Sequence, residues 1–429
     1  MPEPFEKIEE PFSTFFIYEY IKFPKISTLS GVISPMLLGN ARLHLKEVLD
    51  IVISLINQVE VIHKQGFENI DISNTNIAWD GDKIYFIDLD SLHGKNEHSY
   101  NKTSGFWIND MKNNQNIIRD YQRIFFVFAF LFANQNMTFC KTKDQQMIFS
   151  NFWRWTLKKK LSPRFLIYIQ KLLNIKSVND MKEIKKGLKD YIKNYLSRDE
   201  SEWNVCSPFT ILSKVIKESN IKISGTEIYL MNSLSKNNIG EIKKLPLKKL
   251  PTGLSGLSGL FFISKLDKKN NLELTNILNK VISEIDKRIT RFEGVYVMRL
   301  NSFSTIISPY IYDGISGFML IALENKKLDN LYLKKFNFFK YISQPFSKVG
   351  GILNGLSGET LALITYDIKY DKKIFKSEVF EQLFTIIDQI YFRSSYPMMF
   401  NYQKRNLDNT YSNGVSGILD VIDLALSYY

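Results

Sequence analysis

The sequence predicts a mainly helical protein whose two halves differ in character. In the first half, a helical stripe of apolar residues is followed by a polar loop, a hairpin and a strongly apolar helical segment. In the second half, a Gly-x-Ser-Gly phrase recurs four times, and each copy leads into an apolar stretch of helical length. Hydrophobic residues make up 45% of the 429 residues and charged residues 23%, which is the balance of a globular protein.

The first elements can be assigned from apolar spacing and turn residues. The run FFIYEYI at 15–21 indicates a buried strand. Apolar residues recur at steps of three and four over residues 44–63, which predicts a helix, and Gly66 is placed to end it. Residues 76–79 and 83–87 then read as two short strands around an Asp-Gly turn, which favours a β-hairpin.

The most apolar run, IFFVFAFLFA at 124–133, belongs to a helix expected at 120–133. It is too short to cross a bilayer, so we expect a buried helix and no membrane span. The first residues, MPEPFEKIEEPF, do not resemble a signal peptide. The two cysteines, Cys140 and Cys206, cannot build a disulfide framework, which indicates a reducing compartment and a cytoplasmic protein.

Charge gives a weaker indication of partners. The formal net charge of +12 favours an acidic partner. The lysines come mostly as scattered pairs, and no basic stripe is interleaved with aromatic residues, so nucleic acid is not the expected partner.

The four phrases of the second half indicate a helical repeat array. Counted from Gly253, Gly314, Gly355 and Gly414, the intervals are 61, 41 and 59 residues, each long enough for a pair of helices. A single phrase would indicate only a turn and an N-cap, whereas four copies in the same context favour a repeat. Four phrases fall short of a complete ring, so we expect an open or irregular array. The stretch SRDESEW at 197–203 marks the boundary between the halves.

The loop and hairpin of the first half carry the residues of a phosphotransferase site. Such a site needs one carboxylate to orient or deprotonate the acceptor hydroxyl, and an Asp and an Asn to hold magnesium on the phosphates. Asp71 and Asn76 in DISNTN have the spacing of the loop pair, and Asp88 ends the strand after the hairpin. We therefore expect Asp71 to be catalytic, and Asn76 and Asp88 to bind Mg²⁺ and ATP or another nucleoside triphosphate.

Two neighbouring elements also occur in the order that a kinase-like fold requires. This order of elements favours a phosphotransferase site over the alternative, a loop formed only by Asx turns. Asp120 opens the apolar helix, where its counterpart in kinase-like folds braces the catalytic loop through backbone hydrogen bonds. The strand at 15–21 would be the hinge, with main-chain atoms around Glu19 and Ile21 facing the adenine. His63 is expected to be a packed residue at a helix end rather than a base.

DISNTN followed by FIDLDS resembles the kinase domain of the class III and class IV lanthionine synthetases, and the Gly-x-Ser-Gly phrases resemble their cyclase domain. The resemblance implies a protein-kinase-like C-lobe at 1–200 and a partial α/α toroid at 205–429. It implies phosphorylation of Ser and Thr in a ribosomally made precursor peptide, elimination of the phosphate by a lyase, and addition of a cysteine thiol to the resulting alkene.

The sequence departs from that family in three ways. Only about fourteen residues precede the hinge, too few for an N-lobe. The lyase domain that precedes the kinase in this family is not present in the chain. No His follows His98 and only Cys206 lies beyond Cys140, so we expect no zinc, as in class III cyclases, and no Ser-His-Asp hydrolase.

These departures leave three hypotheses. The chain is a synthetase component whose N-lobe and lyase come from a separate polypeptide, or a catalytically inactive pseudokinase scaffold that binds the precursor peptide. The third hypothesis, an unrelated helical repeat protein, predicts that the hairpin between Asn76 and Asp88 is absent.

Overall fold

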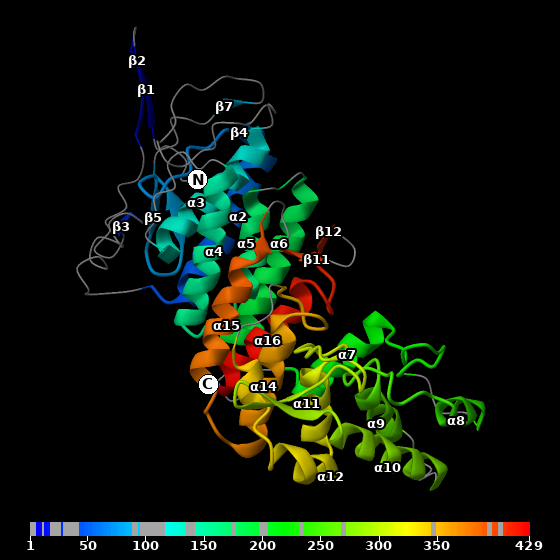
Figure 1. Ribbon diagram of the computed structural model, residues 1–429. Helices are drawn as coiled ribbons and strands as arrows, with labels where there is room; N and C mark the ends of the chain where they lie inside the picture. Colours follow the sequence, from blue (N-terminus) through cyan, green and yellow to red (C-terminus); the bar gives the residue numbers. More distant parts are fainter. Residues whose placement is uncertain are drawn as a thin grey trace. The chain divides into compact units, whose positions relative to one another are not determined.

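The computed structural model is mainly helical (Figure 1). None of the helices in its described part is long and apolar enough to cross a membrane. The structure describes residues 6–10, 13–17, 27–28, 43–87, 93–94, 116–133, 142–173, 175, 177–196, 205–231, 236–266, 272–344, 349–392, 397–401 and 406–429.

Contacts divide the chain into two compact units. The first comprises Met1–Cys140 and Leu172–Leu188, and the second comprises Lys141–Lys171 and Lys189–Tyr429. Residues 141–171 therefore group with the second half of the chain, although they precede the boundary expected at 197–203. Their helix α4 (Thr142–Lys158) packs on a helix more than two hundred residues away, and no local sequence pattern encodes such a contact. The assignment of the two domains stays a prediction.

The first unit combines small antiparallel sheets with long helices. The strands β1 and β2 pair with each other, β3, β5 and β6 form a three-stranded sheet, and β4 pairs with β7. Helices α5 and α6 contribute residues to both units. The bounds are β1 Glu6–Glu10, β2 Ser13–Ile17, β3 Ser27–Thr28, α2 Leu45–Lys64, β4 Phe67–Glu68, β5 Ile77–Trp79, β6 Ile84–Phe86, β7 His93–Gly94, α3 Asn116–Ala133, α5 Arg164–Leu173 and α6 Val178–Tyr191.

Helices α2 and α3 pack against each other and form the core of this unit. Both confirm the sequence prediction, although α3 begins four residues before Asp120. Gly66 ends α2 with a φ of 89°, a left-handed conformation that favours glycine. The strand expected at 15–21 is described only as far as Ile17. The apolar stripe of α2 is buried along its length, at Val48, Val52, Leu55, Val59 and Ile62.

The second unit contains the four phrases. Besides its helices it has a β8–β9 hairpin and a small sheet of β10, β11 and β12. The bounds are η1 Ile192–Leu196, α7 Pro208–Ser219, α8 Lys236–Lys243, α9 Leu257–Leu266, α10 Leu272–Asp286, β8 Ile289–Phe292, β9 Val295–Met298, α11 Ile315–Glu324, α12 Lys326–Leu328, η3 Asp329–Leu333, α13 Phe339–Ile342, α14 Leu356–Tyr370, α15 Lys376–Asp388, β10 Ile390–Tyr391, β11 Met398–Asn401, β12 Asn406–Asp408 and α16 Val415–Tyr428.

Helices α7, α9, α11, α14 and α16 form a closed cycle. Along the chain, α9 contacts α11, α11 contacts α14, and α14 contacts α16 (Figure 1). Helix α16 then contacts α7, and Phe209 of α7 packs on Phe262 of α9, with 6.0 Å between the ring centroids. The expectation of an open or irregular array is therefore wrong. Helix α7 closes the cycle although it carries no Gly-x-Ser-Gly phrase, which is why counting phrases missed it.

Each phrase starts one helix of this cycle in the same way. Gly314, Gly355 and Gly414 directly precede α11, α14 and α16. The first copy contains two overlapping phrases, which begin at Gly253 and Gly256. Helix α9 follows Gly256, so the second of these phrases corresponds to the other three copies. The phrase serine always donates its hydroxyl to a backbone carbonyl six or seven residues upstream, in the pairs Ser258–Thr252, Ser316–Pro309, Ser357–Gly350 and Ser416–Asn409.

The second glycine of each phrase is required by close backbone approach. A Cβ on Gly259, Gly317, Gly358 or Gly417 would lie 2.0 to 2.1 Å from a backbone carbonyl oxygen. Atoms cannot approach so closely, so no other residue fits without moving the upstream loop. The repeat is thus confirmed as a structural unit in which a loop folds back onto the start of its own helix.

We expect Gly358→Ala to lower the free energy of unfolding by about 2–3 kcal/mol, because its methyl group would collide with the carbonyl oxygen of Ile352. Gly240 is a matched control, since it lies inside α8 and an added methyl group meets no atom within 4 Å. Gly240→Ala should leave stability unchanged or raise it slightly. Urea unfolding measures both, and equal effects of the two substitutions would contradict the role given to the repeat.

Backbone hydrogen bonds link the loop after α7 and the loops that precede α9, α11, α14 and α16. The N–H of one loop donates to a carbonyl of the next loop around the cycle, at 2.8 to 3.0 Å. In the last loop the N–H groups of Tyr411 and Ser412 donate to the carboxylate of Glu218 on α7, at 2.8 and 2.7 Å. The links are Ser224 to Ser255, Ser255 to Tyr312, Tyr312 to Leu353, and Leu353 to Ser412.

Candidate functional site

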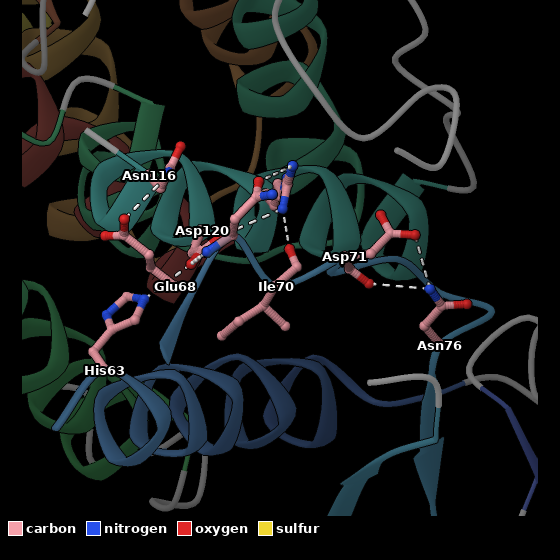
Figure 2. Close-up of polar contacts among 9 residues, drawn as sticks. His63, Glu68, Ile70, Asp71, Asn76, Asn116 and Asp120 are labelled. Carbon is pink, nitrogen blue, oxygen red and sulfur yellow. Dashed lines mark hydrogen bonds and ion pairs between the residues drawn. The ribbon is translucent and has the colours of Figure 1, made fainter. Parts of the chain in front are cut away.

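The loop after α2 brings Asp71 and Asn76 into contact. The Asn76 side-chain amide donates to the Asp71 carboxylate at 3.0 Å and to its backbone carbonyl at 3.1 Å (Figure 2). Asn76 is 9% exposed, whereas Asp71 is half-buried. Because the amide nitrogen of Asn76 donates to Asp71, the Oδ1 atom of Asn76 points away from Asp71, as Figure 2 shows. This oxygen accepts from the Thr75 hydroxyl at 3.1 Å.

The predicted hairpin follows this loop directly. Strands β5 and β6 pair antiparallel, with Ile77 opposite Phe86. The turn is held by Asp80, whose carboxylate accepts from the backbone of Lys83 at 2.6 Å and of Asp82 at 2.8 Å. These hydrogen bonds, the one from Lys83 first, lower the pKa of Asp80. The presence of the hairpin counts against the hypothesis of an unrelated repeat protein.

Beyond β6 the hairpin returns to the loop. The backbone N–H of Ile87 donates to the carbonyl of Asn76 at 3.1 Å, so the end of the second strand lies beside the loop asparagine. Ile87 is the last described residue before Asp88. Three sequence-predicted site residues, Asp88, Glu19 and Ile21, lie outside the described residues.

Asp120 braces the loop as the sequence predicts. Its side chain is fully buried, and its Oδ2 atom accepts from the backbone N–H of Asn69 at 2.9 Å. Asn69 has a φ of 66°, a left-handed conformation that asparagine tolerates better than most residues. Burial raises the pKa of Asp120, while the hydrogen bond from His63 and the charge of Arg123 act in the opposite direction.

His63 is a packed residue, which confirms the sequence prediction. Its Nε2 atom lies 2.9 Å from Asp120 Oδ2 (Figure 2). The side chain of His63 is 8% exposed. The ring packs edge-on against Tyr121, with 5.1 Å between centroids. The contact fixes the end of α2 to the start of α3.

Sequence reasoning missed Arg123, which anchors the residue before the expected catalytic carboxylate. Its buried guanidinium donates to the backbone carbonyl of Ile70 and lies 3.2 Å from Asp120. Burial lowers its pKa, and the charges of Asp120 and Asp71 counter that effect. One signal was available, since Arg123 stands one helical turn after Asp120 and therefore lies on the same face of the helix.

Sequence reasoning also missed Glu359, an ionisable group buried in the second unit. It follows the third phrase on α14, is 0% exposed, and neither carboxylate oxygen has a hydrogen-bond partner among the described residues. Burial raises the pKa of Glu359 to about 8, so this carboxyl group carries a proton at neutral pH. Its charge in turn contributes to the raised pKa of Tyr341, for which burial is the main cause.

Comparison with family models and with curated proteins found no match for this chain. Within the described ranges, no group of three or more His, Cys, Asp or Glu side chains is arranged to hold a metal ion.

Proposed function

We propose that the loop and hairpin at residues 66–87 form the catalytic-loop half of a kinase-type phosphotransferase site. The observation that carries the proposal is the contact between Asp71 and Asn76 in a loop that Asp120 and Arg123 hold by its backbone. Asp71 is the more exposed of the pair and would orient or deprotonate the acceptor hydroxyl. Two separate backbone anchors fix its position, as positioning a reacting group requires.

Asn76 fits a role as a magnesium ligand. Its amide nitrogen is held by Asp71, so its oxygen, which also accepts from the Thr75 hydroxyl, would be the atom that contacts a hard cation. Asp88 would supply the second ligand, because it follows Ile87, whose backbone N–H bonds to Asn76. When bound, Mg²⁺ neutralises charge on the phosphates of ATP or another nucleoside triphosphate.

We further propose that the second unit is an α/α toroid of the zinc-free lanthionine-cyclase type, and that the chain modifies Ser and Thr in a precursor peptide. The closed cycle of five helices and the common geometry of the four phrases support this assignment. The pseudokinase scaffold remains the alternative, and it predicts peptide binding that Asp71→Asn does not change and no phosphoryl transfer.

The first test is thermal stability with and without Mg-ATP. A ligand at 100 times its dissociation constant stabilises a protein by about 2.7 kcal/mol, which appears as a higher melting temperature. We expect this shift in the wild type and its loss in Asp88→Ala. Asp82→Ala, at an exposed position of the hairpin turn, is the matched control and should keep the shift. A wild-type melting temperature that Mg-ATP leaves unchanged would contradict the nucleotide site.

A further inference from the structure

A hollow of about 450 Å³ lies beside α10 in the second unit. Four lysines line it, Lys248 and Lys249 from the segment before α9, and Lys280 and Lys287 from α10. Phe303 lies at the same hollow. We call this surface the lysine groove.

The lysines of the groove are not neutralised. All four are exposed, and none forms an ion pair with any residue that the structure describes. The neighbouring Lys243, by contrast, pairs with Glu273 at 2.8 Å. Four like charges around one concavity create a positive potential that attracts anionic ligands.

The single acidic residue of the lining, Glu284, is already engaged. Its side chain is buried and accepts from the Ser302 hydroxyl, and it lies 3.6 Å from the guanidinium of Arg288. It therefore cannot also neutralise the exposed lysines, and the groove keeps its positive charge.

The floor of the groove is held in place before any ligand binds. The guanidinium of Arg288 is fully buried and donates to the backbone carbonyls of Leu247 at 2.7 Å, Leu250 at 2.8 Å and Leu300 at 3.2 Å. Burial lowers the pKa of Arg288 to about 10, so it stays charged at neutral pH. The Ser302 N–H also donates to the Lys248 carbonyl at 3.0 Å. A preformed surface loses little entropy on binding.

The groove also presents an apolar contact. Phe303 is 71% exposed and Ile306, on the same loop, is 60% exposed. Large exposed apolar side chains beside a charged hollow are typical of protein interaction sites. A single aromatic residue does not provide the stacked series that single-stranded nucleic acid uses, so the observations favour a peptide.

We propose that the lysine groove docks an acidic peptide segment that carries a large apolar side chain. The carboxylates would pair with the four lysines and the apolar side chain would cover Phe303. The proposal goes beyond the phosphotransferase site and does not depend on it, because docking needs no nucleotide. A second copy of this chain is a poor occupant, since each copy carries a formal charge of +12.

Fluorescence anisotropy tests this with the full chain, without nucleotide, and a short labelled peptide of Asp and Glu residues around one central Leu. The charge reversal Lys248→Glu, Lys280→Glu, Lys287→Glu should weaken binding at least about tenfold. The matched control reverses Lys334, Lys335 and Lys340, which line a different hollow and change the net charge equally. The control should change affinity by less than about twofold.

Two further measurements complete the test. Phe303→Ser should remove the preference for the Leu peptide over a peptide of equal charge with Ser in its place. Circular dichroism melting checks that each variant folds, as expected for exposed positions. Equal losses in the two triple variants would overturn the proposal, since net charge alone would explain them. An oligonucleotide of equal charge that displaces the peptide at lower concentration would overturn it in favour of nucleic acid.

Discussion

Replacing Asp120 with alanine should lower the free energy of unfolding by about 3–5 kcal/mol, the range for breaking a buried charged pair. The substitution would leave the buried guanidinium of Arg123 without its carboxylate partner and the buried N–H of Asn69 without its acceptor. Asp120 and Arg123 hold the loop at Asn69 and Ile70, directly before Asp71. The substitution should therefore destabilise the candidate site as well as the packing of α2 on α3. Urea unfolding followed by circular dichroism measures the effect.

Asp82→Ala provides the control for Asp120→Ala, because Asp82 is exposed in the hairpin turn. Its effect should stay within about 0.5 kcal/mol. Asp120→Asn keeps the size of the side chain and one acceptor oxygen, so it should fall between wild type and alanine. A loss below about 1 kcal/mol in Asp120→Ala would contradict the bracing role.

The second large effect is a dependence of stability on pH that comes from Glu359. Its pKa is about 8 in the folded protein, against 4.5 as its ordinary value. Between these values the folded state binds more protons than the unfolded state, so stability falls as the pH rises from about 4.5 to 8. A difference of this size corresponds to about 4–5 kcal/mol. Tyr341 interacts electrostatically with Glu359, and burial raises the pKa of Tyr341 above its ordinary value.

Unfolding of the wild type and Glu359→Gln should therefore be compared at about pH 5 and pH 8. The glutamine side chain does not ionise, so the advantage of the wild type over the variant should shrink by several kcal/mol across this range. Glu381→Gln, on the exposed face of α15, should follow the wild type at both values. A constant difference between the wild type and Glu359→Gln would contradict the burial of an ionisable carboxyl group at this position.

Local patterns predicted the parts of the fold that depend on local interactions. The apolar stripe of α2 and the Asp-Gly turn between β5 and β6 are each set by neighbouring residues, so the spacing of side chains was enough. The contact between Asp71 and Asn76 was also predictable, because the two residues lie five positions apart on one short loop.

The missed features depend on contacts between distant segments. Helix α7 closes the helix cycle through Phe209 and Glu218, yet it lacks the phrase by which the other helices were recognised. Arg123 acts on Ile70 from 53 positions away, and nothing local indicates its target. Glu359 looked like an ordinary helical residue, because its significance comes from burial without a partner.

The most direct test of the central claim is binding of Mn²⁺, as a substitute for Mg²⁺, measured by electron paramagnetic resonance with ATP present. Asn76 should contribute an oxygen ligand, so the wild type should deplete the free Mn²⁺ signal beyond the level that ATP alone produces. Asn76→Ala should lose this additional depletion, whereas Asn57→Ala, on the exposed face of α2, should keep it. If the free Mn²⁺ signal in the presence of ATP is the same with and without the wild-type protein, the result would contradict a nucleotide and magnesium site at this loop.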